Sequence, residues 1–142
     1  MEIKRLSSEH YDQIIELWNK ARLDHRPKGR DSRALLTEEM SAPHCGFIGM
    51  FDEERLIGVV IGNWDGRRGW INRLAIRPDY RGSKLGGKLL QAAESFLREQ
   101  GAIVFTALIE ENNIPSSSCF EKEGYVVEDS IKYYSKRSSQ DD

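Results

Sequence analysis

The chain has 142 residues, of which 39% are hydrophobic and 31% are charged, and its net charge is -2. This length predicts one domain, and the composition is typical of a globular protein, which excludes two-domain enzymes and disordered or collagen-like chains. The 21 basic residues are balanced by 23 acidic ones. A broad positive field is therefore excluded, and we expect no nucleic-acid partner.

The two cysteines, Cys45 and Cys119, lie far apart and have no second Cys or His at metal-ligand spacing. His10, His25 and His44 also form no metal or triad spacing, so we expect reduced thiols and no metal. The first ten residues lack the apolar stretch of a signal peptide. No segment reaches the roughly 18 apolar residues of a membrane span, so we expect a cytoplasmic protein with no membrane partner.

The first part of the chain predicts a short strand and two helices. After a strand near residues 3–6, residues 8–21 place apolar side chains at helical spacing, with a serine available as a cap. Residues 24–33 are charged and contain Pro27 and Gly29, which indicates a loop. A short second helix then carries Leu35, Leu36 and Met40.

The middle of the chain predicts an antiparallel meander. Residues 44–51 and 55–64 are rich in β-branched and aromatic side chains and are separated by an acidic turn. The dipeptide Asp65-Gly66 favours a tight hairpin turn. It leads into a third strand over residues 69–77, which Pro78 ends.

The last part of the chain predicts two helices and two strands. Residues 82–101 form a long amphipathic helix that ends at a glycine, and residues 102–109 form an apolar strand buried on both faces. A short helix over 115–124 and a final strand over 125–134 follow. The fold class is therefore α/β (α+β), with a mixed, mostly antiparallel sheet of about six strands and four helices. The domain covers residues 1–134, and 135–142 form a polar tail.

The turn between the third strand and the long helix has the features of an anion site. Gly82, Gly86 and Gly87 let the backbone approach a ligand, and the free N–H groups and dipole of a helix start attract phosphate. Three cations would add charge-assisted contacts there: Arg81, Lys84 and Lys88.

Two ligand classes fit this turn. Gly82-x4-Gly87-Lys88 satisfies a phosphate-binding loop pattern, but Leu89 stands where a Ser or Thr would bind magnesium. Such a nucleotide binder also needs a parallel sheet, whereas three antiparallel strands precede the turn here. A nucleotide-triphosphate binder is therefore the minor alternative.

Two segments resemble motifs of the GNAT superfamily of N-acetyltransferases. Residues 74–86 are similar to its acyl-CoA-binding motif, Arg/Gln-x-x-Gly-x-Gly/Ala: Arg81 and Gly86 match, and Lys84 stands at the middle glycine. Residues 113–125 are similar to the family segment Asn-x-x-Ala-x-x-x-Tyr-x-Lys-x-Gly-Phe, with its spacing intact. With the order of elements, the resemblance covers about residues 1–134.

This resemblance implies a GNAT-like fold and an acetyl-CoA site between two splayed strands. Pantetheine would bind exposed backbone, and pyrophosphate would lie on the amides of the glycine turn. The residues that it assigns to acetyl-CoA are Leu74, Ala75, Ile76, Arg81, Gly82, Ser83, Lys84, Leu85, Gly86, Gly87, Asn113, Ser116 and Phe120.

The resemblance also implies direct attack of an amine on the thioester in a ternary complex. The attack needs a proton acceptor, for which Asp65 and Glu110 (or its neighbour Glu111) are candidates, although a turn for Asp65 and a solvated strand end for the glutamates are the stronger explanations. Phe120 replaces the tyrosine that donates a proton in many relatives. The possible substitutes are Tyr134, Tyr133, Tyr125, Cys119 and Ser118.

The expected function is transfer of an acetyl group from acetyl-CoA to a primary amine of a small molecule or protein. The loss of the tyrosine leaves a non-catalytic acyl-CoA-binding or regulatory module as the alternative. The sequence does not identify the acceptor amine, but the basic loop over residues 26–33 would attract an acidic one if it is not merely solvated. An exposed last strand would allow a homodimer as well as a monomer.

Overall fold

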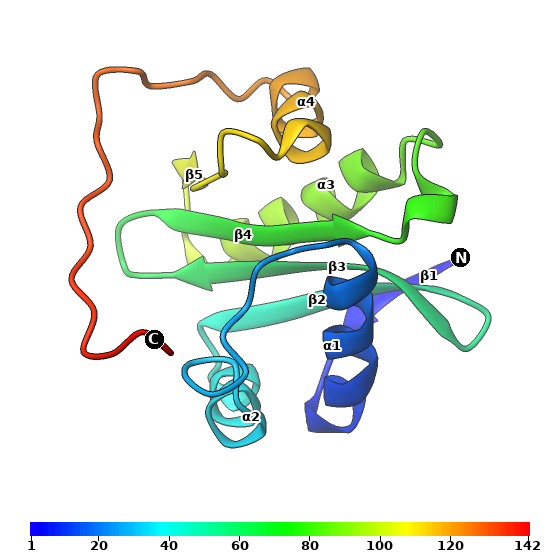
Figure 1. Ribbon diagram of the computed structural model, residues 1–142. Coiled ribbons are helices and arrows are strands. Elements are labelled where there is room, and N and C mark those ends of the chain that lie inside the picture. Colours follow the sequence, from blue (N-terminus) through cyan, green and yellow to red (C-terminus); the bar gives the residue numbers. More distant parts are fainter.

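The computed structural model describes all 142 residues and shows one sheet between two layers of helices (Figure 1). No helix has the length and apolar character that crossing a membrane requires. In chain order the elements are β1 (Glu2–Arg5), a 3₁₀ turn (Ser8–His10), α1 (Tyr11–Lys20), α2 (Arg33–Ser41), β2 (Cys45–Asp52), β3 (Arg55–Trp64), β4 (Gly69–Ile76), a second 3₁₀ turn (Pro78–Tyr80), α3 (Leu85–Gln100), β5 (Phe105–Thr106) and α4 (Ile114–Lys122).

The sheet follows the chain, with the strand order β1-β2-β3-β4-β5. The first four strands are antiparallel neighbours, because tight turns join β2 to β3 and β3 to β4. β5 is parallel to β4, since α3 carries the chain back before β5 begins. The mixed, mostly antiparallel α+β architecture is confirmed, with five strands instead of about six.

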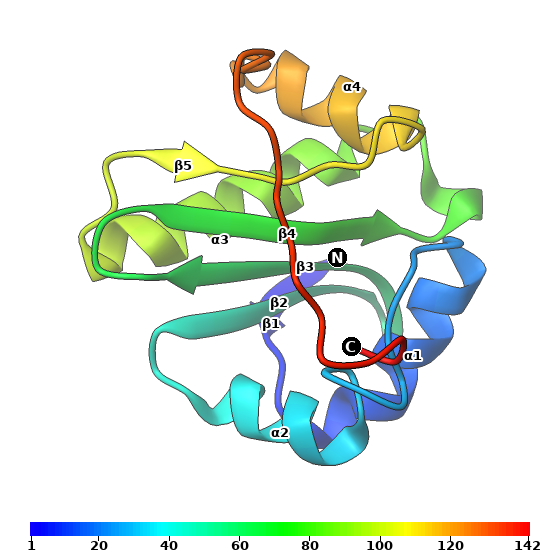
Figure 2. The same ribbon diagram turned by 60° about the vertical axis from the view of Figure 1, so that its left-hand side comes forward.

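Helices cover both faces of the sheet and bury two apolar clusters of 14 residues each. On one face, α1 and α2 bury Trp18, Leu36 and their neighbours against β2 and β3. On the other, α3 buries Leu89 and Leu97, and Phe120 of α4 joins this cluster. Figures 1 and 2 show the two layers from different sides.

The strand expected over residues 102–109 is almost absent. β5 consists of Phe105 and Thr106 alone, and side chains expected to be buried on both faces lie open: Ile103 is 88% exposed and Leu108 is 55% exposed. The prediction of a doubly buried strand was wrong, because β5 lies at the edge of the sheet and only β4 pairs with it.

The final strand expected over residues 125–134 does not form. This segment has an extended, apolar pattern, but no strand pairs with it, and Val126 and Tyr134 are largely exposed. From α4 the chain instead runs across the strands and ends beside the loop between α1 and α2 (Figure 2). A β pattern in the sequence does not make a strand where no partner edge is reached.

Replacing a buried leucine by alanine should lower the free energy of unfolding more than replacing an exposed one. Leu89→Ala removes a side chain with 0% exposure, so the free energy of unfolding should fall by about 2–5 kcal/mol. Leu35→Ala removes a side chain that is 51% exposed on α2, and its cost should stay below about 1 kcal/mol. Urea unfolding measures both, and equal costs would contradict the assignment of Leu89 to the core.

Candidate functional site

A bulge bends β4 in its second half. Asn72 pairs with Ile61 and Ala75 with Val59, so two residues of β4 stand opposite one residue of β3. Arg73, the first of these two, has the left-handed φ of 54°. β5 pairs only with Gly69 and Trp70. The edge of β4 from Ile71 to Ile76 therefore has no neighbouring strand, which leaves backbone groups for a ligand on that side.

The turn after β4 leads to a row of unpaired N–H groups. Gly82 has φ 84° and Lys84 has φ 64°, so the chain turns sharply before α3 begins at Leu85. The N–H groups of residues 82–87 make no hydrogen bond within the protein. Six consecutive free donors at the positive end of a 16-residue helix form an anion site.

The side chains around this turn suit a phosphate ligand. Arg81, Lys84 and Lys88 are exposed beside the free N–H groups, and none of them is in an ion pair. A Cβ on Gly86 would lie 3.1 Å from Sγ of Cys119, so this glycine allows α4 to approach the start of α3. The turn can therefore hold a pyrophosphate through backbone and cations together.

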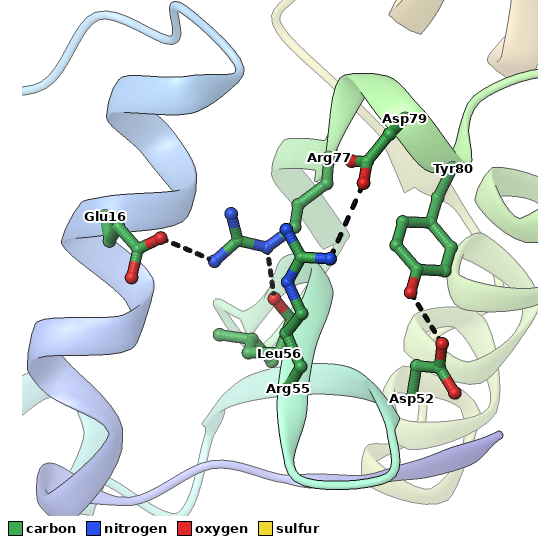
Figure 3. Close-up of polar contacts among 7 residues, drawn as sticks. All are labelled: Glu16, Asp52, Arg55, Leu56, Arg77, Asp79 and Tyr80. Atoms are coloured by element: carbon green, nitrogen blue, oxygen red, sulfur yellow. Dashed lines mark hydrogen bonds and ion pairs between the residues drawn. The ribbon is translucent and has the colours of Figure 1, made fainter.

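Arg77 fixes the point where β4 ends (Figure 3). Its side chain is 6% exposed, and its Nε donates to the carbonyl of Leu56 at 2.8 Å. An NH2 group also donates to Glu16 of α1 at 2.9 Å, and this hydrogen bond lowers the pKa of Glu16. The guanidinium thus joins β4 to β3 and α1 shortly before the glycine turn. Sequence reasoning missed this residue, because only tertiary structure brings its partners together.

Two contacts, one exposed and one half-buried, tie the second 3₁₀ turn to the β2–β3 hairpin (Figure 3). Arg55 donates to Asp79 at 3.5 Å, and the hydroxyl of Tyr80 donates to Asp52 at 2.5 Å. The latter hydrogen bond raises the pKa of Tyr80. With Arg77, these contacts place the glycine turn relative to the sheet.

The expected acetyl-CoA residues of α4 mainly hold the structure together. The side-chain oxygen of Asn113 caps α4 by accepting from the N–H of Ser116 at 3.3 Å. The Ser116 hydroxyl donates to the Leu74 carbonyl at 3.3 Å, which ties α4 to the open edge of β4. Phe120 is 3% exposed and packs edge-to-face on Tyr125, so its ring lies in the core.

The carboxylate of Asp65 belongs to the β3–β4 turn. It accepts from the N–H groups of Arg67 at 2.8 Å and Arg68 at 2.7 Å, and from Nε1 of Trp70 at 2.8 Å. These bonds, the one from Arg68 above all, lower the pKa of Asp65 to about 2. A carboxylate so occupied is a poor proton acceptor, so we assign Asp65 to the turn and not to catalysis.

The other two expected catalytic residues lie on segments without regular structure. Glu110 is exposed, and its backbone carbonyl accepts from the N–H of Asn113, while its carboxylate makes no hydrogen bond. Tyr134 is 86% exposed on the C-terminal segment and makes no side-chain hydrogen bond. The structure does not gather Asp65, Glu110 and Tyr134 into one constellation.

Glu39 of α2 is a carboxylate that sequence reasoning missed. The residue is exposed, and its carboxylate makes no hydrogen bond or ion pair. Desolvation by the protein around the carboxylate raises the pKa of Glu39, while the nearby guanidinium of Arg73 opposes the rise. Arg73 lies on the open edge of β4, so Glu39 and this edge belong to the same region.

A buried ion pair fastens the α1–α2 loop to the bulge of β4. Arg73 donates to both oxygens of Asp31, at 2.6 and 2.7 Å, and the two side chains are 14% and 4% exposed. The N–H of Arg26 donates to the same carboxylate at 2.6 Å, and the hydroxyl of Tyr11 donates to the Asp31 carbonyl at 2.8 Å. The guanidinium also lies 4.6 Å from the ring of Trp18. The loop is therefore held beside the thioester end of the expected acetyl-CoA site.

Comparisons with known proteins agree with this geometry. The model of the acetyltransferase (GNAT) family matches residues 11–125. Acetyltransferase SG1711 of Sodalis glossinidius is 26% identical over 141 residues, which cover 99% of this chain and 98% of the relative. An acetyltransferase of Yersinia pestis (strain Pestoides F) is also 26% identical, over 92% of each chain.

Solved structures show the same fold. The PaiA N-acetyltransferase from Thermoplasma acidophilum, solved in complex with coenzyme A, superposes with a TM-score of 0.80 at 24% identity and covers 90% of this chain and 91% of its own. The aminoglycoside 6'-N-acetyltransferase AAC(6')-IG from Acinetobacter haemolyticus has a TM-score of 0.77 at 17% identity, covering 98% of this chain and 100% of its own.

The chain belongs to the acetyltransferase (GNAT) family. It is therefore an acyl-CoA-dependent N-acetyltransferase, and an acyl-CoA is its co-substrate. Membership in a family of enzymes therefore favours a catalytic protein over the non-catalytic acyl-CoA-binding module. The nucleotide-triphosphate alternative also fails on the fold, because β4 is antiparallel to β3 and Leu89, at the position that would bind magnesium, is completely buried.

Breaking the buried ion pair of Arg73 and Asp31 should lower the free energy of unfolding more than breaking an exposed ion pair. Asp31→Asn leaves a nearly buried guanidinium without its counter-charge, so the free energy of unfolding should fall by about 3 kcal/mol. The control Asp12→Asn breaks the pair of Asp12 with Arg33, whose side chains are 81% and 61% exposed, and should cost less than about 1 kcal/mol. Urea unfolding compares the two, and equal costs would contradict the buried clamp.

Proposed function

We propose that this enzyme transfers an acetyl group from acetyl-CoA to a primary amine of a small molecule or protein by direct attack in a ternary complex. The observation that carries the proposal is the juxtaposition of six free N–H groups at residues 82–87 with the unpaired edge of β4. The first can hold pyrophosphate and the second can hold an extended amide-bearing chain. A coenzyme A thioester contains both chemical features in that order.

The residues present fit this co-substrate. Pyrophosphate takes the turn of Gly82 to Gly87, where Arg81 and Lys84 add charge. The pantetheine amides take the backbone of β4 between the bulge and Ile76, so the side chains of Leu74 and Ile76, which are buried, do not need to contact it. The thioester then lies close to the bulge at Arg73, beneath the fastened α1–α2 loop.

The reaction joins the amine nitrogen to the thioester carbonyl carbon and breaks its bond to sulfur. A backbone N–H of β4 near the bulge polarises the carbonyl as charge develops on its oxygen. The amine loses one proton, and the departing thiolate of coenzyme A is stable enough to be protonated by solvent. Phe120 cannot supply that proton, so the reaction in this chain does not depend on a tyrosine at this position.

For the proton acceptor we propose Glu39. It is a free carboxylate in the region of the bulge, and its raised pKa makes it a better base than an ordinary carboxylate. Glu110 keeps a free carboxylate as well and stays the second candidate. Tyr134 and Asp65 are not needed for this step.

Calorimetric titration with acetyl-CoA tests the donor site. The wild-type protein should bind acetyl-CoA in the micromolar range and remain silent with ATP and magnesium. Lys84→Met removes one charge-assisted contact and should weaken binding about tenfold, and the charge reversal Arg81→Glu about a hundredfold. The control Lys20→Met changes an exposed cation of α1 and should have no effect. Unchanged affinity in Arg81→Glu would refute this donor site.

The pH dependence of turnover tests the proton acceptor. A base works when ionised, so kcat/KM should rise as pH increases through the pKa of Glu39, which lies above the ordinary value for a glutamate. Glu39→Gln should lower kcat/KM by about a hundredfold or more and remove this rise. Glu110→Gln is the matched control and should keep both. A pH profile that is the same in Glu39→Gln and the wild type would rule Glu39 out.

A further inference from the structure

Cations from two distant segments meet at one hollow of the surface. A cavity of about 540 Å³ lies between the α1–α2 loop and the C-terminal segment. The loop contributes Lys28 and Arg30, and the C-terminal segment contributes Lys136 and Arg137; Asp142 is the only acidic residue in its lining. Figure 2 shows how the C-terminal segment descends from α4 across the strands to reach this loop. We call this cavity, defined by its four cations, the cationic hollow.

A second, smaller cavity adjoins it. Its volume is about 240 Å³, Lys28 lines both cavities, and Arg26 and His25 extend the row of basic groups, with Asp141 on the other side. The whole chain has a net charge of -2, so this concentration of positive charge is local. A local positive field in a concave surface raises the concentration of anions there.

Three of the four cations of the cationic hollow have no partner within the protein, and Arg137 is the exception, since its guanidinium donates to Asp142 and Ser135 of its own segment. Exposed arginines elsewhere, such as Arg33 and Arg55, pair with carboxylates. Lys28, Arg30 and Lys136 form no ion pair. Like charges that converge without partners repel one another, and an anionic ligand relieves that repulsion.

A buried ion pair links the loop of the cationic hollow to the region where the thioester is proposed to lie. Arg30 precedes Asp31, whose carboxylate is bound by Arg73, and Arg73 precedes Leu74 at the open edge of β4. The cations are therefore joined to the proposed reaction site by the buried ion pair of Asp31 with Arg73, each of which is next in sequence to a residue of one site. Cations held in this way can fix one end of a substrate whose other end reaches the thioester.

We propose that the cationic hollow binds the anionic group, a carboxylate or phosphate, of the acceptor amine, so that the substrate class is an anionic primary amine. The proposal rests on the proposed acetyl transfer and adds the chemical class of its acceptor. The loop supplies the recognition, and the clamp of Arg73 and Asp31 is the positioning element that relates it to the thioester.

Matched pairs of amines test the proposal. With saturating acetyl-CoA, kcat/KM for 4-aminobutyrate should exceed that for n-butylamine about tenfold, since charge-assisted contacts are worth about 1.5–3 kcal/mol. The same ratio of kcat/KM is measured for O-phosphoethanolamine and ethanolamine, which tests a phosphate in place of a carboxylate. The pair with the larger ratio identifies the preferred anionic group. The double variant Lys28→Gln, Arg30→Gln should lose about tenfold of the preference, while Lys4→Gln, Lys20→Gln, which removes two cations outside the hollow, should keep it. Equal use of the acidic and neutral members would overturn the proposal.

A binding measurement keeps the proposal testable without turnover. Citrate should shift the backbone amide resonances of residues 26–31 in a saturable titration, and the double variant Lys28→Gln, Arg30→Gln should abolish the shifts. Absence of citrate binding in the wild type would overturn the proposal even if no amine of the panel is acetylated. Citrate binding together with a silent acetyl-CoA titration would instead place the failure in the proposed acetyl transfer.

Discussion

The end of β4 is the constraint on which the turn with the six free N–H groups depends. A strand that carries a ligand on its open edge must stop at a defined residue, because the turn that follows has to place six N–H groups toward one anion. Arg77 provides that stop by binding the β3 backbone and α1 at once, with its guanidinium almost fully buried. The bulge at Arg73 lies four residues earlier in the same strand, whose pairing with β3 resumes at Ala75.

Charge is divided between two positions on either side of this strand. Arg81, Lys84 and Lys88 stand at the start of α3, and the cations of the cationic hollow come from the α1–α2 loop and the C-terminal segment. A chain with an acidic net charge thus keeps two separate basic sites. Two anionic parts, one on the donor and one on the acceptor, can be held apart while their reactive ends meet at β4.

The sequence predicted the parts that local pattern determines. The apolar spacing of α1 and α3, the meander of β2 to β4 and the glycine turn were confirmed within a few residues, because each depends on neighbours in the chain. The fate of residues 125–134 could not be predicted, since an apolar extended segment becomes a strand only where an edge is available. The pair of Arg73 and Asp31, 42 residues apart, was also invisible to periodicity and spacing.

The candidate site divides in the same way. The backbone donors of residues 82–87 follow from a motif, whereas the state of a carboxylate depends on its surroundings. Asp65 looks like a possible base in the sequence, yet three donors occupy it in the folded protein. Glu39 carries no motif, and only the approach of α2 to Arg73 distinguishes it from other surface glutamates.

The two-residue pairing of β4 with β5 has a consequence for the motion of the protein. Beyond α3, the chain is attached to the sheet by this short ladder and by the hydroxyls of Thr106 and Ser116, while Phe120 and Tyr125 hold it to α3. Such a unit opens at a lower free energy than the antiparallel core, so its backbone amides should exchange with deuterium before those of β2 and β3. The donor would then enter and leave between β4 and the segment after α3, without unfolding the antiparallel strands or the turn proposed to hold its phosphates.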